Sequence, residues 1–129
     1  MPAIERIILI DDSEADNVYH QIMIERAGFT GELVVLEHGV AGLEYLQAAD
    51  LDIPTYIFLD INMPMMDGFE VAERAAPLLR DKRAVILVMV SSSCAPEDHK
   101  RAGELEIIHG FITKPLTTEA VKDLLADPF

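Results

Sequence analysis

The sequence is short of cationic residues and of cysteine. Lys and Arg total 10 against 23 Asp and Glu, which gives a formal charge of −13 at pH 7. Such a surface repels a phosphate backbone, so we expect no nucleic-acid contact and a partner with a basic surface instead. The single cysteine, Cys94, excludes an internal disulfide and has no Cys or His partner at the spacing of a zinc site.

Long apolar runs are also missing. No run approaches the ~18 residues of a membrane-spanning helix, and the N-terminus lacks a basic segment followed by a small-residue cleavage site. We therefore expect no membrane partner and a cytoplasmic location. The chain has the length of one domain, and we expect residues 1–129 to form a single domain with no output domain.

The sequence does have a regular alternation of two patterns. Short apolar runs rich in Val and Ile indicate parallel strands buried on both faces. They occupy residues 6–10, 32–37, 56–59, 84–90 and, more weakly, 110–113. Between them, apolar residues three and four apart indicate helices, the first with the pattern Ala15, Val18, Tyr19 and Ile22. Strand and helix alternate five times, which predicts a doubly wound α/β fold with right-handed crossovers.

Two helix starts can be predicted from local signals. Ser13 and Asp16 have the spacing of a capping box. Pro96 suits the first turn of a helix. Other residues are expected to be structural: the four histidines, His20, His38, His99 and His109, at the surface or at boundaries, and Met63, Met65 and Met66 packed within their loop.

Polar residues follow the apolar runs. The first run ends in Asp11 and Asp12, the third in Asp60, the fourth in Ser91, and the fifth in Thr113 and Lys114. Ligands of open α/β sheets bind beyond the carboxyl ends of the strands. Because parallel strands bring these ends to one edge, we expect the side chains to converge there.

The chemistry of this set favours a metal and a phosphoryl group. Asp11, Asp12 and Asp60 would repel one another without a cation, and an all-oxygen ligand set favours Mg²⁺. Lys114 and Ser91 supply a positive charge and a hydroxyl donor that suit phosphoryl oxygens. A carboxylate can form an aspartyl phosphate, and its central position makes Asp60 the candidate nucleophile. An isolated acid pair is often a turn or helix cap, so the coincidence of these residues carries the interpretation.

Four segments together resemble the motifs of response-regulator receiver domains, the chemotaxis-regulator-like phosphoacceptors of two-component signalling. They are "ILIDDSEADN", "IFLDINMPMMDGFE", "VMVSSS" and "GFITKPLT". The resemblance covers essentially the whole chain. It implies a flavodoxin-like fold, with a five-stranded parallel sheet of order 2-1-3-4-5 and helices on both faces, in which residues 1–129 are a single receiver domain.

The resemblance also implies a role for each site residue. Asp60 would accept the phosphoryl group with the help of Lys114 and Ser91. The Mg²⁺ ligands would be Asp11, Asp12, Asp60 and the backbone carbonyl of Asn62. Ser91 and Phe111 would form a switch that is read by a downstream protein on the face of the fourth helix, fifth strand and fifth helix. The resemblance further implies a cis peptide bond between Lys114 and Pro115.

The chain departs from the family pattern at two places. Ser91 stands where the family more often has Thr, which removes a methyl group but keeps the donor. The segment "LEIIHG", residues 105–110, replaces a common Gly-Ala turn. This second departure leaves the length of the fourth helix and its output face open.

Three functions compete. The leading hypothesis is a stand-alone receiver that takes a phosphoryl group from a sensor histidine kinase or a histidine phosphotransfer protein. It would not be a classical enzyme, although it would promote its own phosphorylation and slowly hydrolyse the product. The alternative is a Mg²⁺-dependent phosphohydrolase with an Asp nucleophile, which usually carries a second acid where Asn62 stands. A flavin electron carrier would need a loop rich in Ser, Thr and Gly after the first strand, where this chain has "DDSEAD".

Overall fold

The computed structural model describes residues 3–127, in which strands and helices alternate five times. The strands are β1 (Arg6–Ile10), β2 (Glu32–Leu36), β3 (Thr55–Leu59), β4 (Val85–Ser91) and β5 (Ile108–Thr113). The helices are α1 (Glu14–Arg26), α2 (Gly39–Ala48), α3 (Gly68–Leu79), α4 (Pro96–Glu104) and α5 (Thr118–Ala126). Among residues 3–127, no helix is long and apolar enough to cross a membrane.

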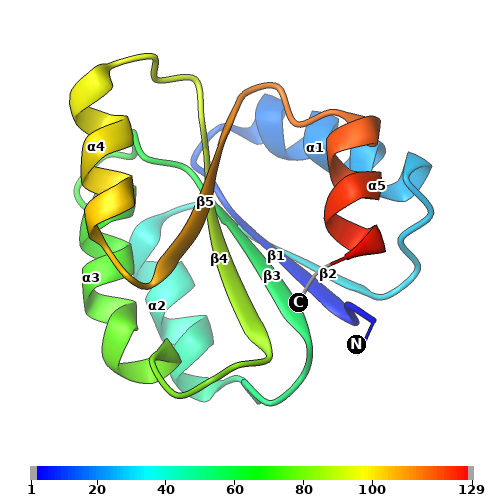
Figure 1. Ribbon diagram of the computed structural model, residues 1–129, viewed down its shortest axis with the longest axis horizontal. Helices are drawn as coiled ribbons and strands as arrows, with labels where there is room; N and C mark the ends of the chain where they lie inside the picture. The colour runs from blue at the N-terminus through cyan, green and yellow to red at the C-terminus, as the bar shows by residue number, and fades with distance from the viewer. Residues whose placement is uncertain (1–2, 128–129) are drawn as a thin grey trace.

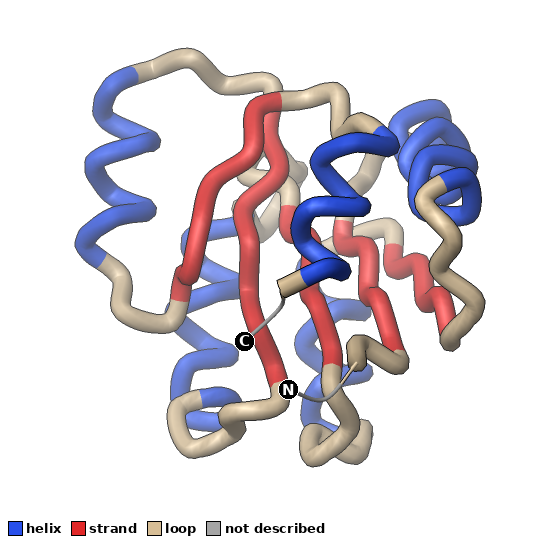
Figure 2. The backbone as a smooth tube through the Cα atoms, turned by 45° about the vertical axis from the view of Figure 1, so that its right-hand side comes forward, coloured by secondary structure: helices blue, strands red, loops and turns tan. Residues whose placement is uncertain are grey.

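All four strand pairings are parallel, and the strand order is β2-β1-β3-β4-β5. The predicted flavodoxin-like fold is therefore confirmed. Helices α1 and α5 cover one face of the sheet, and α2, α3 and α4 cover the other (Figures 1 and 2). The carboxyl ends of the five strands share one edge, at the top of Figure 1.

The alternation of side chains along the central strands builds a core on each face. One core contains Ile8, Ile10, Ile57, Leu59 and Phe69, all at most 3% exposed. The other contains Ile7, Leu9, Tyr56, Phe58, Ile24 and Val121, also at most 3% exposed. Both faces of β1 and β3 are buried, so the acids at their ends directly follow the two strands that are buried at every position.

Helix α1 buries a different face from the one its apolar pattern predicts. The four predicted positions, Ala15, Val18, Tyr19 and Ile22, are all exposed. The buried residues are instead Asn17, His20, Met23 and Ile24. The reason is that polar side chains on the inner face bind backbone groups: Asn17 Nδ2 donates to the Asp11 carbonyl at 2.9 Å, and His20 Nε2 accepts from the Leu116 N–H at 3.4 Å. The surface or boundary position expected for His20 is wrong as well.

The predicted capping box forms only in part. Ser13 caps α1 by accepting from the Asp16 N–H at 3.2 Å, but the Ser13 N–H donates to Asp11 Oδ1 at 2.9 Å and not to Asp16. The carboxylate of Asp16 therefore remains available for another partner. Pro96 begins α4, as predicted.

The loop after β3 differs from its prediction at one methionine. Met63 is buried and Met66 packs against the core, but Met65 is completely exposed and has a positive φ of 70°. Gly68 begins α3 so close to β3 that a Cβ atom there would collide with the backbone carbonyl of Asp60. Glycine at this position therefore allows the loop that follows Asp60 to return directly onto the sheet.

Candidate functional site

Backbone hydrogen bonds extend the sheet by one step beyond its strand ends and place the polar residues. The Asp11 N–H donates to the Leu36 carbonyl at 3.0 Å, and the Asp60 N–H donates to the Ile10 carbonyl at 2.9 Å. At the ends of β4 and β5, the Lys114 N–H donates to the Ser91 carbonyl at 2.9 Å. The main chain at these positions is thus as well fixed as the strands themselves.

Three carboxylates meet at this edge. Asp11, Asp12 and Asp60 each offer an oxygen, and these oxygens lie within 4.8 Å of one another. Asp11 and Asp60 are 4% and 6% exposed, whereas Asp12 is open to solvent. The predicted convergence is confirmed for these three residues. Their donor set is all oxygen and fits a hard cation such as Mg²⁺. Asn62 lies two residues beyond Asp60 and is exposed.

Lys114 reaches into this acid cluster with its ammonium group. Its side chain is 12% exposed, and Nζ lies 2.7 Å from Asp11 Oδ2, 2.7 Å from Asp16 Oδ2 and 3.4 Å from Asp60 Oδ1. An ammonium group has three N–H donors, and here it has three carboxylate partners. The peptide bond between Lys114 and Pro115 is cis, which confirms the prediction.

Burial and charge shift the pKa values of these groups. Burial, and next the neighbouring Asp11 carboxylate, raise the pKa of Asp60 from 3.8 to about 6, against the opposing effect of Lys114. For Lys114, burial favours the neutral amine, but hydrogen bonds to Asp11 and Asp16 outweigh it and raise the pKa. The hydrogen bond from Lys114 in turn lowers the pKa of Asp16. The site therefore holds a permanent cation beside a carboxylate that ionises reluctantly.

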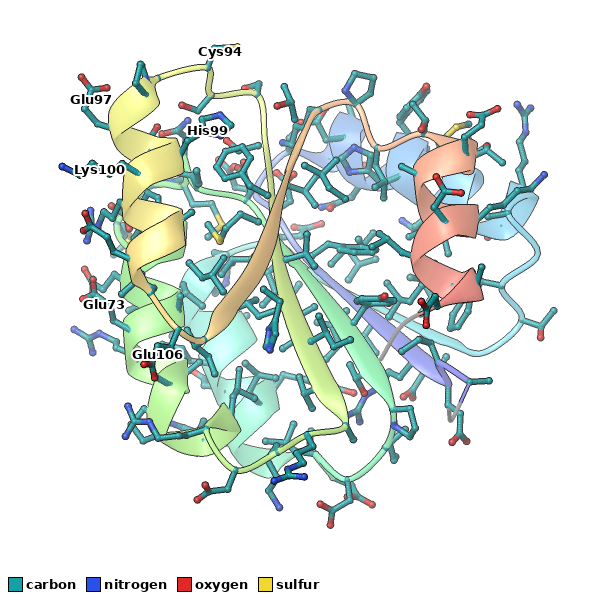
Figure 3. The ribbon with its side chains drawn as sticks, viewed as in Figure 1. Glu73, Cys94, Glu97, His99, Lys100 and Glu106 are labelled. Carbon is teal, nitrogen blue, oxygen red and sulfur yellow. The ribbon has the colours of Figure 1, made fainter. Side chains whose placement is uncertain are left out.

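Ser91 and Phe111 lie toward the carboxyl ends of β4 and β5. Ser91 ends β4 and is fully buried, and its Oγ accepts from the Ser93 N–H at 3.3 Å. Phe111 is half-buried in β5 and stacks on His99 of α4, with the ring centroids 3.9 Å apart. His99 lies on the side of α4 that faces β5, whereas Glu97 lies on the outer side (Figure 3).

The segment that departs from the family pattern forms the start of β5. β5 begins at Ile108, two residues earlier than predicted, and its register with β4 shifts between Leu87 and Val88. His109 accepts a hydrogen bond from the Leu87 N–H through Nδ1 at 3.3 Å. Helix α4 keeps 9 residues and ends at Glu104. The segment 105–110 is thus accommodated by an irregularity in the pairing of β4 and β5, and it does not prevent the formation of α4.

Two residues at the site escaped the sequence prediction. The sequence pattern predicts a capping role for Asp16 and a surface or boundary position for His20, yet both contact the loop after β5. The Lys114–Asp16 pair joins residues 98 positions apart, and the His20–Leu116 pair joins residues 96 apart. The one sequence signal is their spacing: residues four apart on a helix lie on the same face, so Asp16 and His20 can contact the same loop.

The chain resembles known proteins over nearly its whole length. Residues 7–126 match the family model of the response regulator receiver domain. The probable methanogenesis regulatory protein FilR2 of Methanothrix harundinacea is 31% identical over 119 residues, which cover 90% of this chain and 76% of FilR2. The chemotaxis protein CheY of Halobacterium salinarum is 27% identical over 124 residues, 95% of either chain.

The solved structures give the same result. The response regulator receiver protein of Dyadobacter fermentans superposes with a TM-score of 0.82 at 29% identity, covering 93% of this chain and 94% of that chain. Some curated relatives are longer, and this chain spans 13%, 61% and 49% of three of them.

Proposed function

The chain belongs to the response regulator receiver family of two-component signalling, and on this basis we propose that it acts as a single receiver domain that is phosphorylated on Asp60. The observation that carries the proposal is the position of Asp60. It is buried at the carboxyl edge of the sheet, beside two further carboxylates and 3.4 Å from a lysine ammonium.

In the proposed reaction, a carboxylate oxygen of Asp60 attacks the phosphorus of a phosphohistidine. The N–P bond breaks, an O–P bond forms, and the imidazole nitrogen keeps the electron pair and takes a proton from solvent. Lys114 offsets negative charge on the transferred oxygens, and Ser91 donates a hydrogen bond to them. Asp11, Asp12, Asp60 and the carbonyl of Asn62 would hold a Mg²⁺ ion, which when bound supplies positive charge to the same oxygens. Water then slowly hydrolyses the aspartyl phosphate.

The donor in this proposal is a sensor histidine kinase or a histidine phosphotransfer protein. The net charge of −13 favours partners with a basic surface over nucleic acid, and we place the protein in the cytoplasm with its phosphodonor. The downstream target is a protein that binds the face formed by α4, β5 and α5. On this face Phe111 would change its position when Ser91 binds the phosphoryl group.

Phosphorylation can be tested with acetyl phosphate and Mg²⁺, followed by the mass of the intact protein. The wild-type chain should accumulate a phosphate-sized mass increase that hydroxylamine removes. Asp60→Asn should abolish it, because the nucleophile is lost at nearly constant volume while the fold is kept. Asp81→Asn is the matched control, since Asp81 is an exposed acid of the α3–β4 loop, and it should be labelled like the wild type.

Two outcomes would contradict the proposal. Labelling of Asp60→Asn at the wild-type rate would show that another residue is the acceptor. Rapid consumption of acetyl phosphate without accumulation of the phosphoprotein would instead favour a phosphohydrolase.

A further inference from the structure

Asp16 lies outside the set of residues to which the receiver pattern assigns a role, yet it makes one of the shortest ion pairs at the site. Its Oδ2 atom lies 2.7 Å from Lys114 Nζ, as close as Asp11 does, whereas Asp60 is at 3.4 Å. Asp16 stands in the first turn of α1, and its side chain is 43% exposed. The ammonium group therefore lies closer to the carboxylate of Asp16 on α1 than to that of Asp60.

Hydrogen bonds hold the main chain around Lys114, so the side chain is the part that can move. The Lys114 N–H is bound to the Ser91 carbonyl at 2.9 Å, and the Leu116 N–H is bound to His20 Nε2 at 3.4 Å. His20 is 4% exposed and lies one helical turn after Asp16 on α1. Helix α1 thus holds the loop after β5 at two points. His20 binds the backbone of this loop at Leu116, and Asp16 binds the charged side chain of Lys114.

A lysine in this position has two tasks with different demands. Without a metal, its ammonium group neutralises Asp11 and Asp60, so it competes with any cation that enters between them. Once Asp60 carries a phosphoryl group, the same ammonium must turn to the phosphoryl oxygens. The carboxylate of Asp16, which lies outside the acid cluster, can pair with Lys114 in both states. In the first state this pairing leaves room for a cation between Asp11 and Asp60, and in the second it competes with the phosphoryl oxygens for the ammonium group.

We propose that Asp16 is a positioning residue that holds Lys114 on the α1 side of the site, so that Mg²⁺ binds more readily and the phosphoryl group is held less tightly. This inference rests on the proposed phosphorylation of Asp60. Asp16 would thus raise the affinity for Mg²⁺ and lower the affinity for the phosphoryl group, without any direct contact to the phosphoryl group.

The proposal predicts opposite effects of one substitution on two ligands. In Asp16→Asn, Lys114 pairs more closely with Asp11 and Asp60, so the affinity for Mg²⁺ should fall. At saturating Mg²⁺ the freed lysine binds a phosphoryl mimic better, so the affinity for beryllofluoride should rise. Each change should be about two- to fivefold, the range for a partly exposed ion pair. A loss of helix stability alone would lower the affinity for both ligands.

The affinities can be measured by NMR titration of backbone amides, first with MgCl₂ and then with beryllofluoride at saturating Mg²⁺. Glu14→Gln is the matched control, because Glu14 is an exposed acid in the same first turn of α1 and forms no salt bridge among residues 3–127. It removes the same charge and should leave beryllofluoride affinity at the wild-type value.

The outcomes separate this inference from the proposed function. If the wild type binds both ligands but Asp16→Asn shifts both affinities in the same direction, the positioning role is wrong and the proposed function stands. If Glu14→Gln tightens beryllofluoride as much as Asp16→Asn does, the effect comes from net charge and the role is again wrong. If the wild type binds neither ligand, the proposed function fails and the inference fails with it.

Discussion

Asp60 is 6% exposed and lies beside Asp11, and burial together with this neighbour raises its pKa from 3.8 to about 6. Between about pH 4 and pH 6 the folded chain retains a proton that the unfolded chain has lost. Above this range the folded chain must carry a buried charge. The stability that protonation of Asp60 provides is therefore present at low pH and lost as the pH rises through about 6.

This sign leads to a prediction for the metal-free protein. In EDTA, the free energy of unfolding of the wild type should fall relative to that of Asp60→Asn by roughly 2 kcal/mol as the pH rises from 4 to 7. Asp60→Asn should therefore be the more stable protein at neutral pH. Urea unfolding followed by circular dichroism measures both. His20, whose pKa is lowered by burial and by Lys114, opposes this trend, but it is present in both proteins and cancels in the difference. A difference that stays constant with pH would refute the buried-charge account.

At the scale of residues, sequence reasoning found the acids but not their partner in α1. Asp11 and Asp60 could be predicted because each ends an apolar run, and parallel strands leave one place for such residues. Asp16 could not, because its contact with Lys114 depends on how α1 is rotated against the loop after β5. That rotation is set by Asn17 and His20, two polar residues that satisfy buried backbone groups.

At the scale of elements, α4 contacts α3 and β5 through polar and aromatic side chains. Its one buried residue is Ala102. The side chain of Arg101 pairs with Glu73 at 3.0 Å and lies 4.5 Å from the centre of the Phe69 ring, and His99 stacks on Phe111. Few buried apolar contacts mean that such a helix can shift at low cost in free energy.

This attachment suggests how phosphorylation would reach the surface. In the proposed switch, a hydrogen bond from Ser91 to the phosphoryl group would draw the β4–α4 loop inward, and Phe111 would then leave His99 to fill the space. One charge-assisted hydrogen bond of about 1.5 to 3 kcal/mol is enough for a tenfold shift between two states close in energy. Beryllofluoride should therefore change the backbone amide shifts around Phe111 and Lys122 as well as those of the acid cluster.

A variant tests whether this change depends on the proposed coupling. Ser91→Ala should keep the shifts near Asp60 and lose those near Phe111, because the hydroxyl group is removed and the acceptor is kept. Changes confined to the acid cluster in the wild type would show that Phe111 is a static core residue.

The element pattern explains why the fold could be predicted and the face of α1 could not. Strands buried on both faces leave a continuous apolar run, which is visible without knowledge of their neighbours. A helix is assigned from the side on which its apolar residues fall, and in α1 these residues, Val18, Tyr19 and Ile22, lie on the exposed side. The apolar stripe is thus an unreliable guide where the buried face binds polar backbone groups.

At the scale of the whole molecule, the charge of −13 works against the compact state, and the three clustered carboxylates add to this repulsion locally. A cation that binds only the folded chain should stabilise it by mass action. At a free Mg²⁺ concentration 100 times the dissociation constant, the gain is about 2.7 kcal/mol, which corresponds to a rise in Tm of about 10 °C for a domain of this length. Thermal unfolding with and without MgCl₂ measures it.

Two comparisons separate binding at the site from general screening of charge. NaCl at the same ionic strength screens the surface charges equally well but does not occupy a site for a hard divalent cation, so it should raise the Tm less than MgCl₂ does. Asp12→Asn removes the exposed carboxylate of the cluster while leaving the buried pair of Asp11 and Asp60 in place, so the variant should fold and respond to MgCl₂ and NaCl alike. An equal response of the wild type to both salts would mean that the acid cluster does not bind Mg²⁺, and the phosphorylation of Asp60 would then require another source of positive charge than the metal.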